Sequence, residues 1–233
     1  MEEPDVTHEH ATPDAPQVTV RGEGRREADP EFARIWVTVS ARGRDRTETL
    51  TDLTRRNARV LDLVKAQGDT VERLETGRLS ISPELGRRGR GEHVHAFVGR
   101  VRITAELTDF TALGELVTRL ADLEMTSVDG PWWELRPDSP AYAEARRLAV
   151  TEAVRRARAY AEALGTSLAS LVELSDAGLG GSEMSMPPAF AGARRVAFAA
   201  ESAGEAPPLD LEPQRQTVTA EVVARFTMRP PAL

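Results

Sequence analysis

The stretch between Ser139 and Gly165 is the longest helical pattern in the chain, and it constrains the fold more than any other segment. Ser139 stands where an N-cap belongs, and Pro140 occupies the first helical position, where its missing N–H leaves no donor unpaired. Gly165 is the residue type that commonly ends a helix in the left-handed conformation. These signals predict one long helix that must pack its apolar face against another element.

Small side chains dominate the predicted apolar face of this helix. At a period of about 3.6 residues, that face comprises Tyr142, Ala145, Ala149, Ala153, Ala157, Tyr160 and Leu164. Alanines at steps of four let a helix axis approach a sheet closely, whereas large side chains would hold it away. Arg146 and Arg156 fall on or beside this face. Either their stems cover apolar surface while the guanidinium groups reach water, or one of them pairs with a buried or intersubunit carboxylate.

Alternation of apolar and polar residues predicts half-buried strands at residues 35–41, 97–107 and 218–228. From Ile35 to Leu135 the predicted order is strand, helix, strand, strand, helix, strand, which is the arrangement of ferredoxin-like folds. The last strand must return to a sheet, and we expect it to pair with the N-terminal strand.

Two aspartates and a proline set further boundaries. Asp45 and Asp109 stand at N-cap positions of the two helices in the ferredoxin-like portion. A strand through Leu79 and Ile81 is predicted to stop at Pro83.

The predicted fold class is α+β, with helices packed on a largely antiparallel sheet. It combines the ferredoxin-like βαββαβ portion with the long C-terminal helix and the terminal strand. The predicted organisation is a disordered tail over residues 1–16 followed by a domain over residues 17–233. This domain can form two lobes, in which residues of about 45–130 are inserted between 17–44 and 131–233. It also contains a flexible loop over residues 176–213.

Composition excludes several classes of function. The chain has no cysteine, so it forms no disulfides, thiol nucleophiles or cysteine-ligated metal sites. Its formal net charge of -7 argues against non-specific nucleic-acid binding. No stretch approaches the roughly 18 apolar residues of a membrane span. The first residues lack the basic start and apolar stretch of a secretory signal, so we expect a cytoplasmic protein.

Two motifs resemble ligand sites but lack essential parts. Gly22-Glu23-Gly24 follows a strand, as in dinucleotide-binding folds, but Asp29-Pro30 makes a turn where a helix should open. A sheet edge or bulge explains these glycines better. His93 and His95 share one strand face, and His8 and His10 show the same spacing. No third ligand stands at a readable spacing, so we predict neither a metal nor a cofactor.

Other candidate residues point to contacts rather than to catalysis. The loop Arg87-Arg88-Gly89-Arg90 is either a solvated hairpin tip or a contact for phosphates or an acidic partner. Trp132 and Trp133 are adjacent in a strand and therefore face opposite sides. Either both pack within the monomer or one lies at a subunit interface. No catalytic motif appears and we predict no catalytic residues. The candidate structural or interface residues are Trp132, Trp133, Arg146 and Arg156.

The chain resembles the SIMPL-domain family over nearly all of residues 17–229. The resemblance rests on a set of short motifs in a fixed order: Val20-Arg21-Gly22-Glu23-Gly24 with Asp29-Pro30, the Gly130-Pro131-Trp132 turn, Glu144-Ala145-Arg146, Ala149-Val150, Ala153, Arg156-Ala157, Tyr160-Ala161, Leu164-Gly165, Leu174-Ser175 and the strand from Val218 to Met228. This family contains bacterial proteins with relatives in animals.

The resemblance implies the same α+β architecture and assembly into a homo-oligomer, because a similar periplasmic member forms a ring-like oligomer. Family members are associated with oxidative stress, with cell-envelope antigens and with scaffolding of a signalling kinase. We therefore expect a non-enzymatic, self-associating binding or scaffold module linked to stress response. The alternatives are a small-molecule-binding or hydrolytic enzyme that uses a cleft between lobes, and an oligomer of the cell envelope.

Overall fold

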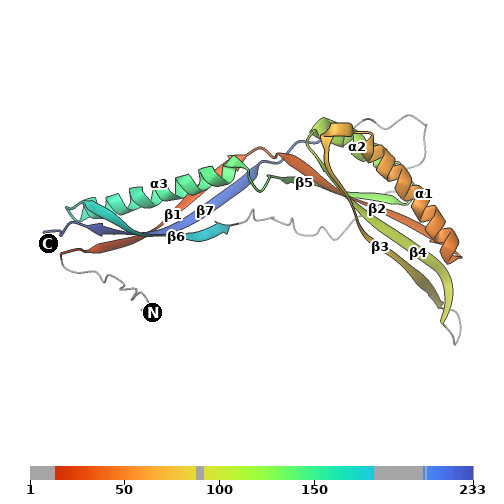
Figure 1. The fold of residues 1–233 in the computed structure, drawn as a ribbon, viewed down its shortest axis with the longest axis horizontal. Coiled ribbons are helices and arrows are strands. Elements are labelled where there is room, and N and C mark those ends of the chain that lie inside the picture. Colours follow the sequence, from red (N-terminus) through yellow and green to blue (C-terminus); the bar gives the residue numbers. More distant parts are fainter. Residues whose placement is uncertain (1–13, 88–91, 181–206, 208, 233) are drawn as a thin grey trace, which may run out of the picture. The chain divides into compact units, whose positions relative to one another are not determined.

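The computed structural model describes residues 14–87, 92–180, 207 and 209–232. Its elements follow in the order β1 (Gln17–Ala28), β2 (Phe32–Gly43), α1 (Arg46–Lys65), η1 (Gly68–Thr70), β3 (Val71–Arg87), β4 (Glu92–Leu107), α2 (Phe110–Ala121), β5 (Thr126–Glu134), α3 (Pro140–Ala163), β6 (Leu168–Gly180) and β7 (Gln216–Met228) (Figure 1). The strands form two antiparallel sheets, which confirms the predicted α+β class.

Two compact units divide the chain. Unit 1 comprises Met1–Ala28, Pro137–Ala191 and Gln216–Leu233, and unit 2 comprises Asp29–Arg136 and Gly192–Arg215. Unit 1 is therefore assembled from segments far apart in the sequence, whereas most of unit 2 is one continuous segment.

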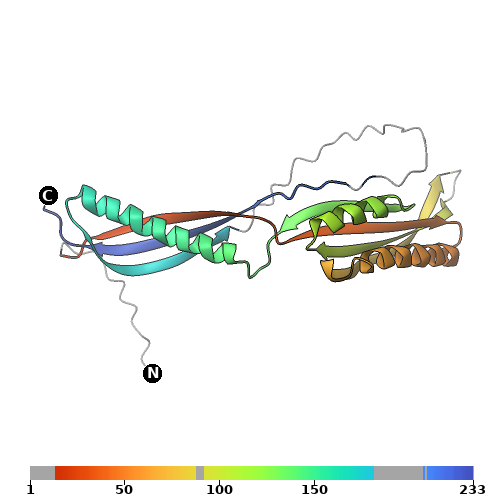
Figure 2. The same ribbon diagram turned by 90° about the horizontal axis from the view of Figure 1, so that it is seen from above.

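Unit 2 has the predicted ferredoxin-like arrangement. Its sheet has the strand order β3-β4-β2-β5, and α1 and α2 pack on the same face of this sheet (Figures 1 and 2). The predicted caps are confirmed, because the carboxylates of Asp45 and Asp109 accept hydrogen bonds from backbone N–H groups in the first turns of α1 and α2. The core between helices and sheet contains Ile35, Val37 and Ile103, each fully shielded from solvent.

The strand β3 is longer than its sequence predicts. It does not stop at Pro83 but continues to Arg87, paired with β4. The reason is position, because β3 lies at the edge of the described sheet and the missing N–H of a proline is tolerated on an edge strand.

Unit 1 is a three-stranded sheet of order β1-β7-β6 with α3 on one face. The terminal strand β7 pairs with β1 along its whole length, from Gln17 opposite Thr227 to Ala28 opposite Gln216, as predicted. The helix α3 begins after the N-cap Ser139, with Pro140 at its first position, and the chain leaves it through Gly165 at a φ of 69°.

Glycines in β1 bring α3 close to the sheet. A Cβ atom added at Gly22 would clash with the Ala149 carbonyl oxygen and lie 2.6 Å from the Ala153 nitrogen. A Cβ atom added at Gly24 would clash with the Ala145 carbonyl oxygen. These glycines therefore serve the close packing of a helix on a strand, and no helix opens after them to bind a nucleotide.

The buried face of α3 differs slightly from the predicted one. It consists of the alanines at 141, 145, 149, 153, 157 and 161. Tyr160 and Leu164, which the helical period placed on this face, are 56% and 40% exposed. The backbone of β1 is so close to the helix at Gly22 and Gly24 that only the row of smallest side chains fits between them.

Two other predictions fall near segment boundaries. The expected turn at Gly130-Pro131-Trp132 lies inside β5, where Gly130 has a φ of 112° and the pairing with β2 shifts register between Arg34 and Trp36. The first residues of the predicted loop 176–213 belong to β6, which continues to Gly180. Residues 181–206 and most of the predicted tail 1–16 lie outside the described residues.

Candidate functional site

The strand β6 of unit 1 carries three leucines on the face of the sheet that α3 covers elsewhere. Leu168, Leu171 and Leu174 lie opposite Met228, Phe226 and Ala224 of β7, all three of which are buried. Antiparallel partners point to the same side of a sheet, so the leucines extend the apolar layer beneath α3. Their spacing of three would alternate faces in a regular strand. Irregularities between Leu168 and Ser170 and between Leu171 and Glu173 restore the common face.

This apolar layer is left uncovered at β6. The helix α3 contacts mainly β1 and β7 and has few contacts with β6. As a result, Leu171 and Leu174 are 54% and 47% exposed, and Val172 is 37% exposed. In the described part of the chain, β6 also has a strand neighbour on one side only. Unit 1 thus presents exposed apolar side chains along a free strand edge.

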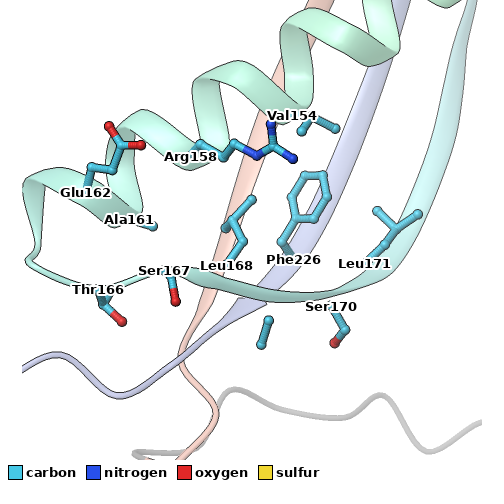
Figure 3. A pocket seen from close by; sticks show the side chains of 11 residues that line it. Val154, Arg158, Ala161, Glu162, Thr166, Ser167, Leu168, Ser170, Leu171 and Phe226 are labelled. Carbon is cyan, nitrogen blue, oxygen red and sulfur yellow. The ribbon is translucent and has the colours of Figure 1, made fainter.

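A hollow of about 430 Å³ lies between the last turns of α3 and the start of β6 (Figure 3). Its lining residues are Val154, Arg158, Ala161, Glu162, Thr166, Ser167, Leu168, Ala169, Ser170, Leu171 and Phe226. Leu168, Leu171 and Phe226 supply apolar surface from the sheet, and Val154 and Ala161 supply it from the helix. The hollow is largely open to solvent, so a ligand lying in it would stay partly exposed.

The polar groups around the hollow differ in whether they have a partner among the described residues. The Thr166 hydroxyl donates to the Arg229 carbonyl oxygen at 2.7 Å, and the Ser170 hydroxyl lies 2.7 Å from that of Thr227. Figure 3 shows the Arg158 side chain extending over the hollow toward Phe226, whereas Glu162 points away from it. No carboxylate among the described residues lies within 4.0 Å of the Arg158 guanidinium. Within the described part of the chain, Arg158 is therefore a cation without an ion pair, at the mouth of a hollow whose lining is partly apolar and partly polar.

The two adjacent tryptophans face opposite sides of the sheet in unit 2. Trp133 packs edge-on against Phe110 of α2, with ring centroids 4.8 Å apart, and joins the core. Trp132 lies on the other face, where its ring centroid is 4.2 Å from that of Trp36. The Arg102 guanidinium lies 5.1 Å from the Trp36 ring. Both tryptophans are partly exposed, and their role at an interface stays a prediction.

The sheet of unit 2 also carries a charge network that the sequence did not indicate. Arg34 of β2 places its Nη2 2.9 Å from Glu106 Oε1 of β4 and its Nη1 2.7 Å from Glu134 Oε1 of β5. Burial raises the pKa of Glu134, the nearby charge of Glu106 adds to this increase, and Arg34 opposes it. The three residues lie 28 or more positions apart, so no spacing signal could have grouped them.

This network neutralises charge rather than forming a catalytic pair. Among the described residues, the hydrogen bonds and ion pairs of both carboxylates are made with arginine nitrogens, with no hydroxyl or imidazole between them. An acyl- or phosphoryl-transfer centre needs a nucleophile within hydrogen-bond reach of its base.

The remaining candidates do not converge on one site. Arg156 is exposed and lies 3.2 Å from Glu152, and Arg146 is exposed on the same helix. His95 is exposed. The described parts of the chain do not include the His93 side chain, His8, His10 or the loop residues from Arg88 to Arg90. Where side chains are described, no three His, Asp or Glu residues form a group that could hold a metal. In the same residues, no helix is both long and apolar enough to cross a bilayer.

Comparison with known proteins places the chain in a family. Residues 18–226 match the family model SIMPL, described as a protein of unknown function (DUF541). The chain belongs to the SIMPL family. Two similar relatives are the 26 kDa periplasmic immunogenic proteins of Brucella melitensis biotype 1 and Brucella abortus strain S19. Each is 26% identical over 179 residues, which cover 74% of this chain and 68% of the relative.

These relatives overturn one prediction. Both SIMPL proteins from Brucella are named periplasmic, so the prediction of a cytoplasmic protein is wrong. That prediction rested on the first residues of the sequence alone, and the point at which a sequence starts does not decide where the mature protein resides.

Proposed function

We propose that this SIMPL protein is a non-enzymatic, self-associating binding module of the bacterial periplasm. The observation that carries the proposal is the exposed apolar edge of β6 in unit 1. The names of the Brucella relatives support the compartment. The family resemblance supports assembly and a role in tolerance of oxidative stress. The family is described as a protein of unknown function, and that description names no enzymatic activity.

The edge of β6 has the properties of an association surface. A strand with one free side presents unpaired backbone N–H and C=O groups that can pair with a strand of another chain. Here the same strand exposes Leu171, Val172 and Leu174, so a second copy would cover apolar surface while adding backbone hydrogen bonds. Covering water-exposed leucines beside a buried apolar layer is favourable, because it removes apolar surface from water.

Size-exclusion chromatography with light scattering over a range of concentrations tests the proposal. We expect the wild-type protein to assemble. The double variant Val172→Lys with Leu174→Lys should need a concentration at least about tenfold higher to form the same assembly. Each lysine places a charge at a site that association would bury, and an unpaired buried charge is strongly unfavourable. Both positions are exposed in the isolated chain, so the variant should fold.

Leu79→Lys supplies the matched control, because Leu79 is 57% exposed on a strand of unit 2. This variant should assemble as the wild type does. A wild-type protein that is strictly monomeric at every concentration would contradict the proposal. So would a double variant that associates unchanged.

A further inference from the structure

We propose that the hollow between α3 and β6 binds a carboxylic acid with a flexible apolar chain, such as a medium-chain fatty acid. The proposal goes beyond self-association, because it concerns a small-molecule site within one copy of unit 1. It rests on the apolar part of the hollow's surface, on the Arg158 guanidinium that extends over it, and on its volume.

The apolar surface comes from the strands β6 and β7 and from the helix α3. Phe226 of β7 is 7% exposed, and beside it Leu168 and Leu171 of β6 continue the same apolar layer beyond the reach of α3. Val154 and Ala161 line the helix side. A linear hydrocarbon chain can lie along this surface and shield Leu171, which is 54% exposed to water in the free protein.

The charge at the mouth selects the head group. Arg158 extends over the hollow, and Glu162, one turn later on α3, points away from it (Figure 3). By contrast, Arg155 and Arg156 on the same helix are both neutralised by Glu152. The planar guanidinium of Arg158, which forms no ion pair with the described residues, can bind a carboxylate through two parallel hydrogen bonds. The site therefore favours an anionic head and disfavours a cationic one.

The volume limits the ligand to a small amphiphile. About 430 Å³ suffices for a chain of moderate length but not for a folded protein segment. The hydroxyls of Thr166 and Ser170 already form hydrogen bonds within the protein, so a ligand need not supply polar groups to pair with them.

Isothermal titration calorimetry with decanoate, below its micelle-forming concentration, tests the site on the full chain. We expect decanoate to bind, and butyrate and decyltrimethylammonium to bind at least about tenfold more weakly. Arg158→Gln should weaken decanoate at least about tenfold, because it removes the charge but keeps much of the side-chain volume. Leu171→Asp should abolish binding, because it places a negative charge on the apolar surface.

Arg147→Gln is the matched control. Arg147 is an exposed arginine that lies 11 residues before Arg158, about three turns along the same side of α3, and it does not line the hollow. It should leave the affinity for decanoate unchanged. The circular dichroism and melting temperature of each variant show whether it has folded.

Several outcomes would overturn the inference. These are an absence of heat with decanoate, equal affinity for the cationic amphiphile, or an equal loss in Arg147→Gln and Arg158→Gln. Binding to phosphatidylglycerol vesicles without binding to decanoate would instead indicate a membrane surface. Val172 and Leu174 do not line the hollow. Titration of the double lysine variant therefore separates this inference from the proposed self-association, since either can fail alone.

Discussion

Single residues set the distance between helix and sheet in unit 1. Gly22 and Gly24 lie on β1 directly beneath Ala145, Ala149 and Ala153 of α3. In the sequence these glycines resemble a fragment of a nucleotide-binding motif. In the structure their lack of a side chain lets two backbones approach, and the alanines opposite them serve the same purpose. The pattern of glycine against alanine is therefore one packing feature, although its parts lie more than 100 residues apart.

Gly22→Ala should destabilise the protein, because the added methyl group would clash with the Ala149 carbonyl oxygen. We expect a loss of about 1 to 3 kcal/mol in the free energy of unfolding, the usual cost of overpacking. Urea denaturation measures it. The control is Gly77→Ala on β3, where the nearest atom to a new Cβ atom is 3.5 Å away. Equal stability of the Gly22 variant and the control would show that the helix is not held this closely.

Glu134 makes the stability of the folded protein depend on pH. Burial raises its pKa above the ordinary value of 4.5, so the folded state holds the proton more tightly than the unfolded state does. Its stabilising contribution is therefore full below about pH 4.5 and is lost as the pH rises through the pKa of the folded state. We expect the stability of the wild type relative to Glu134→Gln to fall as the pH increases from 4 toward 7, as measured by urea denaturation.

Glu84 serves as a control of opposite sign. Its hydrogen bond with Arg42 lowers its pKa, so its contribution is present above the ordinary pKa and is lost as the pH falls. The stability of the wild type relative to Glu84→Gln should therefore change in the opposite direction. The same slope in both variants would contradict the assignment for Glu134.

At the scale of elements, α3 and β6 together determine the candidate site. The helix is centred over β1 and β7, which leaves the apolar face of β6 open. The irregularities in β6 then turn Leu168, Leu171 and Leu174 to that open side. A regular strand would have directed Leu171 to the opposite face, and neither the hollow nor the apolar edge would exist in this form.

At the scale of the whole molecule, the two units differ in how the chain builds them. Unit 1 joins three separate segments, so it forms only when distant parts of the chain meet. Unit 2 contains the ferredoxin-like portion in one run, with its own buried core. We propose that unit 2 is an independently folding domain. This division differs from the sequence-based proposal of an inserted lobe at about residues 45–130, because β2 and β5 complete the sheet of unit 2.

A fragment of residues 29–136 should fold on its own. We expect a single cooperative thermal transition by circular dichroism, because the core of α1, α2 and the four strands lies within this range. The fragment should melt below the full chain, since Leu211, which packs against this core, is missing. Restoring residues 207–215 through a short linker should recover part of the difference. A broad, non-cooperative transition would contradict independent folding.

The sequence by itself determined the elements and their order. The caps at Asp45, Asp109 and Ser139 and the alternation in β4 and β7 are local signals, because hydrogen bonding within a turn and the periods of 3.6 and 2 depend on neighbouring residues. These signals were sufficient for the α+β class, the βαββαβ portion and the pairing of the last strand with the first.

Only the tertiary structure decided which surfaces remain open. Three features depend on contacts between distant segments. The buried face of α3 is rotated away from Tyr160, and the three leucines of β6 share one face. The third feature is the grouping of Arg34 with Glu106 and Glu134. A helical or strand period gives the direction of a side chain relative to its own element. It does not give the position of that element on its sheet, and that position leaves β6 uncovered and exposes Arg158 above the hollow.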